Sequence, residues 1–206
     1  MALPHPHPLR IAIDGMDAAG KTILADELSA VLIEKTSRLI IRASIDRFHN
    51  PREVRYRQGE NSPEGYYADS FDLAALRQNL LDPLGPGGSR AIRTELFDFS
   101  SDSAVPSATV EVPADAILLF DGIFLHRPEL VDCWDFSIFV QVTYETVLTR
   151  AVKRDGARMG GWQGVLDRYM TRYLPAQRRY LETCRPDEHA GIVVVNDDPL
   201  NPEFRE

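Results

Sequence analysis

The chain has 206 residues, of which 44% are hydrophobic and 26% are charged. This length and composition are typical of one globular domain and exclude a fibrous repeat or an intrinsically disordered chain. A net charge of −8 disfavours sequence-independent binding to nucleic acid. The 2 cysteines form no Cys-x-x-Cys pair, so we expect no cysteine-rich zinc site and a protein of the reducing cytoplasm. No apolar run is long enough to cross a membrane.

The first third of the chain combines apolar segments with a glycine-rich segment and a long polar one. Its opening residues hold no uninterrupted apolar stretch, so no signal peptide is expected. The polar segment has a length that is usual for functional loops. In chain order we expect a flexible tail (1–8), a buried strand (9–14), a glycine-rich turn (15–20), a helix (23–35), a second strand (38–43) and a long loop (47–63).

The rest of the chain alternates helices with apolar strands. Strands that are apolar throughout and separated by helices indicate a parallel sheet covered on both faces. We therefore expect a single α/β domain over residues 1–206. In chain order the elements are a helix (71–81), a small β-hairpin outside the sheet (90–99 with 108–112), strands (116–120 and 135–142), a helix ending near residue 153, a glycine-rich polar loop (155–164), a helical region and a last strand (192–195).

Residues 15–22, GMDAAGKT, match the phosphate-binding motif G-x-x-x-x-G-K-[ST] between a predicted strand and a predicted helix. The backbone N–H groups of such a loop surround phosphate oxygens, and the next helix adds its positive N-terminal end. We expect Lys21 to reach the β- and γ-phosphates of ATP and Thr22 to ligate Mg²⁺. A glycine-rich turn without a ligand is the less favoured alternative. The predicted nucleotide-binding residues are Gly15, Met16, Asp17, Ala18, Ala19, Gly20, Lys21 and Thr22.

Two acidic residues follow predicted strands. Asp46 comes after the second strand and Asp121 ends the apolar strand AILLF. Since ligands of open α/β sheets bind beyond the carboxyl ends of the strands, both carboxylates are expected to face the P-loop. Asp121 would act on Mg²⁺ or its water, and Asp46 would accept the proton of an attacking hydroxyl. The alternative for each is a turn or helix-cap carboxylate.

Arginines surround the glycine-rich segment 155–164. Arg150 and Arg154 are one helical turn apart, and Arg158 follows within the segment. Arginines on a mobile lid can close over a transferring phosphoryl group and stabilise its charge. We therefore predict a catalytic role for Arg150, Arg154 and Arg158. A solvated helix face is the alternative.

Together these segments resemble the uridine kinase/phosphoribulokinase family of P-loop kinases. The resemblance implies a P-loop NTPase three-layer α/β fold with a mainly parallel five-stranded core sheet, an ATP–Mg²⁺ site and an arginine lid. It also implies that Asp46 is the general base for a sugar hydroxyl. Besides the P-loop, the resemblance rests on SIDRFH (44–49), SPEGYYADSFD (62–72), LLFDGIF (118–124), WDFSIFV (134–140) and TRAVKRD (149–155).

The chain departs from uridine kinases where those proteins meet the nucleoside. Their aspartate for the ribose hydroxyls, in F-D-H-P-D-A-F-D, is replaced by Tyr66, although Asp69 remains. Their pyrimidine-contacting Y-D-F-x-x-H element is FDFSSD over residues 97–102, so both base-contacting side chains have changed. The substrate-binding residues that the resemblance implies are Asp46, Tyr66, Asp69 and Phe97.

These features favour an ATP- and Mg²⁺-dependent kinase that phosphorylates a hydroxyl of a small molecule, and the resemblance implies a nucleoside. The 47–63 loop would lie on the acceptor side, where Arg52, Arg55 and Arg57 would suit an acceptor with its own phosphate or carboxylate; a solvated loop is the alternative. Two alternatives stay open: a kinase for another riboside, sugar or vitamin-like metabolite, and a catalytically silent ATP-binding regulator. The chain lacks the Asn-Lys-x-Asp motif of GTPases. We expect no nucleic-acid or membrane partner, and a homo-oligomer stays open.

Overall fold

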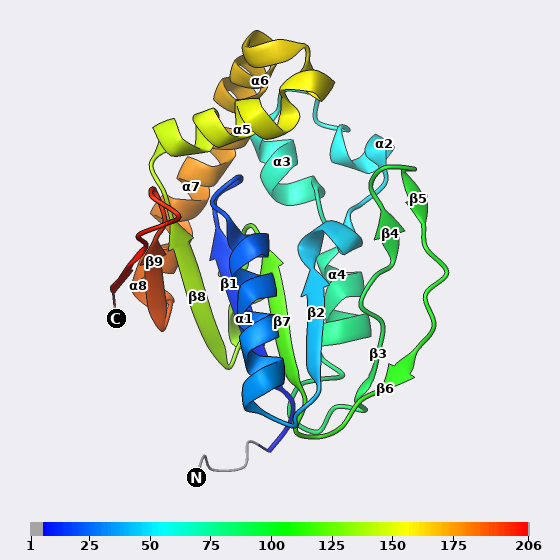
Figure 1. Cartoon of the computed structure of the whole chain (residues 1–206). Coiled ribbons are helices and arrows are strands. Elements are labelled where there is room, and N and C mark those ends of the chain that lie inside the picture. The colour runs from blue at the N-terminus through cyan, green and yellow to red at the C-terminus, as the bar shows by residue number, and fades with distance from the viewer. Residues whose placement is uncertain (1–5, 206) are drawn as a thin grey trace.

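Six strands form one sheet in the order β10-β9-β8-β1-β7-β2 (Figure 1). The computed structural model describes residues 6–205. Five of the strands are parallel, as expected, whereas β10 pairs antiparallel with β9 at the edge and was not predicted. The strands are β1 (Leu9–Gly15), β2 (Ile40–Ser44), β7 (Ile117–Gly122), β8 (Phe136–Gln141), β9 (Ile192–Val195) and β10 (Glu203–Arg205).

Helices cover both faces of the sheet because its central strands are apolar on both sides. Every residue of β7 is buried. Leu119 packs in one core with Ala25 of α1, whereas Leu118 packs in the opposite core with Tyr180 of α7. Figure 1 shows α1 in front of the sheet and α4 and α7 behind it. The helices are α1 (Lys21–Lys35), α2 (Arg52–Arg55), α3 (Pro63–Asp69), α4 (Leu73–Leu76), α5 (Tyr144–Met159), α6 (Gly161–Arg168), α7 (Leu174–Cys184) and α8 (Pro186–His189).

Two short ladders stand apart from the main sheet. The strands β3 (Ala91–Ile92) and β6 (Val110–Glu111) pair antiparallel, and so do β4 (Phe97–Asp98) and β5 (Ser103–Ala104). The first ladder joins the two segments of the predicted hairpin, so this prediction is confirmed.

The predicted lid loop over 155–164 is helical. The α5 helix continues to Met159, and α6 begins at Gly161 after a left-handed Gly160 with φ of 80°. The prediction of a loop was therefore wrong, and the glycines mark the corner between two helices. Figure 1 shows α5 and α6 lying across the end of the sheet at which the parallel strands terminate.

The loop predicted over 47–63 is also partly helical. A 3₁₀ turn (Ile45–Phe48) follows β2, the short α2 comes next, and Pro63 begins α3. Pro63 suits this first position because its fixed φ fits a helix and its missing N–H costs nothing there. Only the stretch between α2 and α3 retains the irregular character that the sequence predicts.

The predicted flexible tail (1–8) is only partly described, since residues 1–5 lie outside the described range. Pro6 is exposed, but His7 and Pro8 are buried, and His7 Nε2 lies 3.7 Å from Asp135 Oδ1. For these two residues the prediction was wrong. Within residues 6–205 no helix combines the length and apolar character needed to cross a membrane.

Candidate active site

The P-loop, residues 15–22, connects β1 to α1. Gly15 has φ of 153°, and a Cβ atom there would collide with the Val140 carbonyl oxygen of the neighbouring strand. Gly20 has φ of 100°, and a Cβ atom there would lie 2.7 Å from Asn196 Nδ2. Both positions therefore require glycine. The loop turns its backbone toward the first turn of α1, where phosphate binds in proteins of this architecture.

Lys21 is the first residue of α1 and is 9% exposed. Its ammonium group donates to the Met16 carbonyl oxygen at 2.7 Å. Burial lowers the pKa of Lys21, and the nearby carboxylates of Asp17 and Asp14 act in the opposite direction. The ammonium is thus held under the loop, close to the acidic groups of the site.

A cavity of about 510 Å³, here called the P-loop cavity, opens beside Lys21 and Thr22. Arg150 of α5 closes one side of it by donating to the Ala19 carbonyl at 3.2 Å and to the Asn196 carbonyl at 2.6 Å. Asn196, at the end of β9, donates from Nδ2 to the same Ala19 carbonyl at 2.7 Å. These bonds fix the P-loop to the carboxyl end of β9. The structure therefore gives Arg150 a role in holding the loop.

Asp121 lies at the end of β7 beside the P-loop. It is 3% exposed, and its Oδ2 accepts a hydrogen bond from Thr22 Oγ1 at 2.8 Å. Its Oδ1 pairs with Arg42 Nη2 at 3.0 Å. Carboxylate and hydroxyl oxygens are ligands that Mg²⁺ accepts. Within residues 6–205 no three His, Cys, Asp or Glu side chains gather as a metal cluster.

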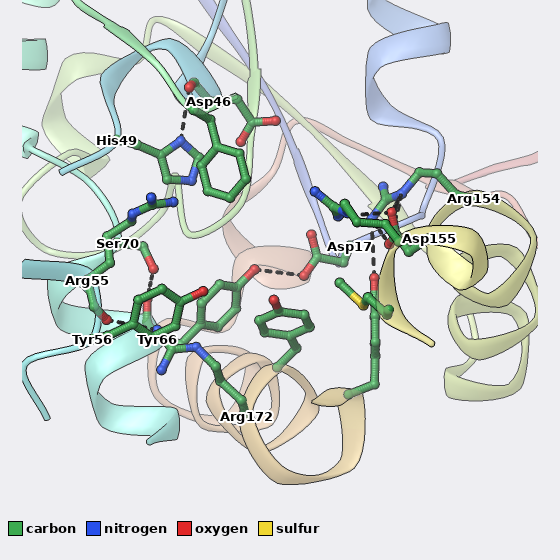
Figure 2. Close-up of a pocket in the computed structure, with 15 residues that line it drawn as sticks. Asp17, Asp46, His49, Arg55, Tyr56, Tyr66, Ser70, Arg154, Asp155 and Arg172 are labelled. Atoms are coloured by element: carbon green, nitrogen blue, oxygen red, sulfur yellow. Dashed lines mark hydrogen bonds and ion pairs between the residues drawn. The ribbon is translucent and has the colours of Figure 1, made fainter. Parts of the chain in front are cut away.

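A second cavity, of about 370 Å³, lies on the other side of the P-loop and is here called the Asp46 cavity. Figure 2 shows its side chains converging from several elements. Arg154 lines both cavities, so the two meet at this guanidinium. The lining residues that the sequence predicts are Asp17, Asp46, Tyr66, Arg154 and Arg158.

Asp46 occupies the 3₁₀ turn after β2, where the Ser44 hydroxyl accepts from its N–H at 3.4 Å. The residue is exposed to the cavity. Even so, the protein atoms around the cavity desolvate the carboxyl group and raise its pKa above the ordinary aspartate value. The nearby His49 opposes this shift, and Asp17 adds to it. A carboxylate with a raised pKa is a stronger base, which suits proton abstraction from a hydroxyl.

Asp17 is the P-loop residue that lines the Asp46 cavity. Its Oδ2 accepts from the Tyr66 hydroxyl at 2.7 Å and from Gln177 Nε2 at 2.7 Å. Burial raises the pKa of Tyr66 well above the usual value, and the negative charge of Asp17 adds to the shift, so the phenol stays protonated as the donor. The Tyr66 ring packs on Tyr173, with centroids 4.5 Å apart. The position that is aspartate in uridine kinases thus holds a phenol that anchors a P-loop carboxylate.

The two lid arginines beyond Arg150 share one carboxylate. Arg154 Nη2 lies 2.9 Å from Asp155 Oδ2, and Arg158 Nη2 lies 3.1 Å from Asp155 Oδ1. Asp155 is 5% exposed, whereas both arginine side chains are more than half exposed. Asp155 therefore holds the guanidinium groups of Arg154 and Arg158 at the cavity wall, and both groups remain accessible from the cavity.

The geometry is that of a phosphate-binding loop between two cavities, and comparison with known proteins agrees with it. The model of the phosphoribulokinase/uridine kinase family matches residues 10–200. The chain belongs to this family. It is therefore a P-loop kinase, a phosphotransferase whose acceptor is a hydroxyl group.

Individual members of the family support this assignment. The chain is 31% identical to uridine-cytidine kinase B of Dictyostelium discoideum over 190 residues, covering 91% of this chain and 74% of that protein. It is 26% identical to the uridine kinase of Alkaliphilus metalliredigens, covering 91% of this chain and 86% of that protein. The solved structure of a possible uridine kinase from Bacillus stearothermophilus has the same fold, with a TM-score of 0.72, 24% identity, and coverage of 93% and 91%.

Two of the substrate residues expected from the family pattern do not reach the Asp46 cavity. Asp69 is 2% exposed, and its carboxylate is held by Arg57 and by Gln58 Nε2. Phe97 is 6% exposed and packs inside. Neither residue lines the cavity. Phe99, which follows the end of β4 at Asp98, lies at the cavity wall instead.

Several lining residues were not singled out by the sequence analysis, although His49, Ser70 and Asp155 lie within segments that carry the family resemblance. The end of β9 could have been suspected, since ligands bind beyond the carboxyl ends of parallel strands, and Asn196 stands there. Arg55 belongs to the arginine-rich loop that the sequence suggests for an anionic acceptor, and it lines the Asp46 cavity. The missed residues of that cavity are His49, Tyr56, Ser70, Phe99, Asp155, Met159, Tyr169, Arg172 and Tyr173.

Proposed function

We propose that this kinase transfers the γ-phosphoryl group of ATP, with Mg²⁺, to a hydroxyl of a nucleoside or nucleoside-like metabolite. The observation that carries the proposal is the position of Arg154, which lines both the P-loop cavity and the Asp46 cavity. A phosphoryl group passing from one cavity to the other would cross beside this guanidinium. Charge-stabilising groups at the point of transfer are the main means by which kinases accelerate the reaction.

The nucleotide would occupy the P-loop cavity. The backbone of residues 15–22 and the Lys21 ammonium would hold the phosphates, and Arg150 would keep the loop in place. Thr22 and Asp121 would hold the metal, since their oxygens already lie together. Mg²⁺, when bound, neutralises charge on the phosphate oxygens.

The acceptor would occupy the Asp46 cavity. Asp46 would take the proton from the attacking hydroxyl, and its raised pKa supports this role. The aromatic side chains of Tyr66 and Tyr173 offer flat surfaces for a ring of the acceptor. Uridine-type relatives support a nucleoside as the acceptor. We infer that the reaction takes place in the cytoplasm, which the free thiols of Cys133 and Cys184 support.

The test is an ATP-consumption screen over nucleosides and small hydroxylated metabolites, with the Asp46→Asn variant as the blank. Asn keeps the size of the side chain but cannot accept the proton. We expect turnover of the best acceptor to fall by about 10²–10⁴, while the affinity for ATP stays close to that of the unmodified protein.

The matched control is Asp132→Asn, since Asp132 is exposed and lines neither cavity. Its turnover should stay within about twofold of the unmodified protein. Equal turnover of the Asp46→Asn protein would refute the assignment of the base. Binding of ATP without phosphorylation of any compound would favour a silent ATP-binding regulator.

A further inference from the structure

One wall of the Asp46 cavity carries two buried arginines that the proposed chemistry does not use. Arg55 is 5% exposed and Arg172 is 2% exposed, and both line the cavity. Figure 2 shows them with Tyr56 on one side of the cavity, while Asp17, Arg154 and Asp155 lie on the other. Burying a guanidinium is costly unless an anion compensates its charge.

Arg172 has no such compensation from the residues that the structure describes, 6–205. Its Nη1 donates to the carbonyl oxygens of Glu60 and Ser62 at 3.1 and 3.0 Å, and its Nη2 donates to the Arg55 carbonyl at 3.0 Å. Within residues 6–205 it forms hydrogen bonds to carbonyls and contacts the Tyr56 ring at 4.7 Å, but no ion pair with a carboxylate. Burial lowers the pKa of Arg172, which reflects this desolvated charge. Carbonyls hold the guanidinium in place, and its charge lies at the cavity wall.

Arg55 is compensated only in part. Its Nη2 pairs with Asp102 Oδ1 at 2.5 Å, and its guanidinium lies 4.2 Å from the centroid of the Phe99 ring. Within the described part of the chain, the Arg55 Nε–H is buried and meets no acceptor. A buried donor left without a partner is rare and needs an explanation. The ion pair with Asp102 therefore leaves the Arg55 guanidinium incompletely satisfied.

The charged groups on the P-loop side of the cavity lie opposite Arg55 and Arg172 (Figure 2). Asp155 is neutralised by Arg154 and Arg158. Asp17, with its hydrogen bonds from Tyr66 and Gln177, lies on the opposite side from Arg55. The cavity therefore has a basic end at Arg55 and Arg172, whereas at the P-loop end the carboxylates of Asp17 and Asp155 are balanced by Arg154 and Arg158. A ligand with an anionic group and a hydroxyl would be oriented by these two ends.

We propose that the phosphate acceptor of this kinase carries an anionic group, a carboxylate or a phosphate, that binds at Arg55 and Arg172. The inference rests on the proposed function and narrows its substrate class. Guanidinium groups recognise such oxyanions through charge-assisted hydrogen bonds that a neutral amide or hydroxyl does not match.

The experiment compares acceptors in matched pairs that differ by the anionic group. The carboxylate arm uses orotidine against uridine and glycerate against glycerol, and the phosphate arm uses ribose 5-phosphate against ribose. Initial rates with ATP give kcat/KM for each compound, and calorimetry gives its affinity. In the pair with the best acceptor, we expect the anionic member to exceed the neutral one by about tenfold or more in kcat/KM. The arm that responds identifies the group.

Two variants with opposite expected effects on the anionic-to-neutral ratio of kcat/KM test whether the preference for an anionic acceptor depends on Arg55. Arg55→Gln should reduce the anionic-to-neutral ratio by about tenfold or more. Since Arg55 is buried and its loss can impair folding, Asp102→Asn provides the second test. Asp102 has φ of 50°, a conformation that asparagine also tolerates. Releasing Arg55 from its carboxylate should raise the ratio several-fold. Arg47→Gln is the matched control, since Arg47 is exposed and lines neither cavity.

The outcomes separate the inference from the proposed function. If neutral members are phosphorylated as well as their anionic partners, the inference is overturned and the proposed function stands. If no compound is phosphorylated, the proposed function fails, and calorimetry then tests the inference. Binding of an anionic compound that Arg55→Gln abolishes supports the inference. Equal binding of the anionic and neutral compounds, or no binding of either, overturns it. A ratio that Asp102→Asn and Arg47→Gln change alike also overturns it.

Discussion

The two cavities that meet at Arg154 are built in different ways. The P-loop cavity owes its phosphate-facing groups to one contiguous segment, residues 15–22, whose backbone N–H groups need glycine but few particular side chains. The Asp46 cavity is formed by side chains from segments far apart in the sequence. Asp46, Arg55, Tyr66, Phe99, Arg154 and Arg172 come from the β2 end, α2, α3, the β4–β5 turn, α5 and the helical turn before α7.

This difference explains how one fold can use one phosphate donor and several acceptors. A site made by backbone changes little when side chains are exchanged, whereas a site made by side chains can be altered one residue at a time. By the resemblance to uridine kinases, Tyr66 and Asp102 occupy positions at which that motif pattern has an aspartate and a histidine. Tyr66 now anchors Asp17, and Asp102 holds Arg55. Changes in the Asp46 cavity should therefore discriminate between acceptors, and changes in the P-loop cavity should not.

The largest effect that tests this comparison is expected for Lys21→Met. Methionine keeps most of the length of the side chain and removes the ammonium that stabilises phosphate charge. We expect kcat to fall by about 10²–10³, by the same factor for every acceptor. Steady-state rates with one anionic and one neutral acceptor measure this.

Lys153→Met is the matched control, because Lys153 is exposed on α5 and lines neither cavity. Its kcat should stay within about twofold of the unmodified protein. A loss in Lys21→Met that differed strongly between the two acceptors would show that the P-loop cavity also selects the acceptor, which would remove the distinction between the cavities.

A smaller and more selective effect is expected for Tyr66→Phe. This change keeps the ring that packs on Tyr173 and removes the hydrogen bond to Asp17. A hydrogen bond to a charged group contributes about 1.5–3 kcal/mol, so kcat/KM for the acceptor should fall by about tenfold or more. The KM for ATP should stay unchanged, because the hydroxyl lies in the Asp46 cavity.

Tyr173→Phe removes a hydroxyl from the same cavity without breaking such a bond. In the described part of the chain the Tyr173 hydroxyl forms no hydrogen bond, while its ring contacts Tyr66 and Tyr169. We expect less than about a twofold change in either kinetic constant. Equal losses in the two variants would mean that the Tyr66–Asp17 bond does not position the acceptor.

The features that could be predicted from the sequence are those with a local physical signal. Continuous apolar runs between helices predict the five parallel strands, and the run 192–195 coincides with β9. The spacing of Gly15, Gly20 and Lys21 predicts the phosphate loop, because its conformation depends on these residues alone. Strand-end placement predicts that Asp46 and Asp121 face the P-loop, and both do.

Features that depend on distant contacts could not be predicted in this way. The glycines of 155–164 predict a loop, but Asp155 is buried between two arginines and Val165 packs in the core, so tertiary contacts keep the segment helical. Arg172 is held by carbonyls more than 100 residues away in the sequence. No local pattern around Arg172 or Arg55 reveals that their side chains meet at one wall.

The smallest expected effect concerns stability and again involves the Asp46 cavity. The pKa of Asp46 is raised in the folded protein above its ordinary value of 3.8. The folded state therefore favours the protonated carboxyl, and stability associated with this group is present at low pH and lost as pH rises through the folded-state pKa. At pH 7 the ionised carboxylate destabilises the fold, so Asp46→Asn should raise the Tm. Differential scanning fluorimetry at pH 7 and near pH 4 measures this change in Tm.

The rise should shrink toward pH 4 as the native carboxyl becomes protonated, whereas Asp132→Asn should shift the Tm little at either pH. A lower Tm for Asp46→Asn at pH 7 would show that the carboxylate stabilises its own site. In that case the Asp46 cavity would be held together by the same charge that it uses for catalysis, as the P-loop cavity is held by Arg150, and the two cavities would be alike in this respect.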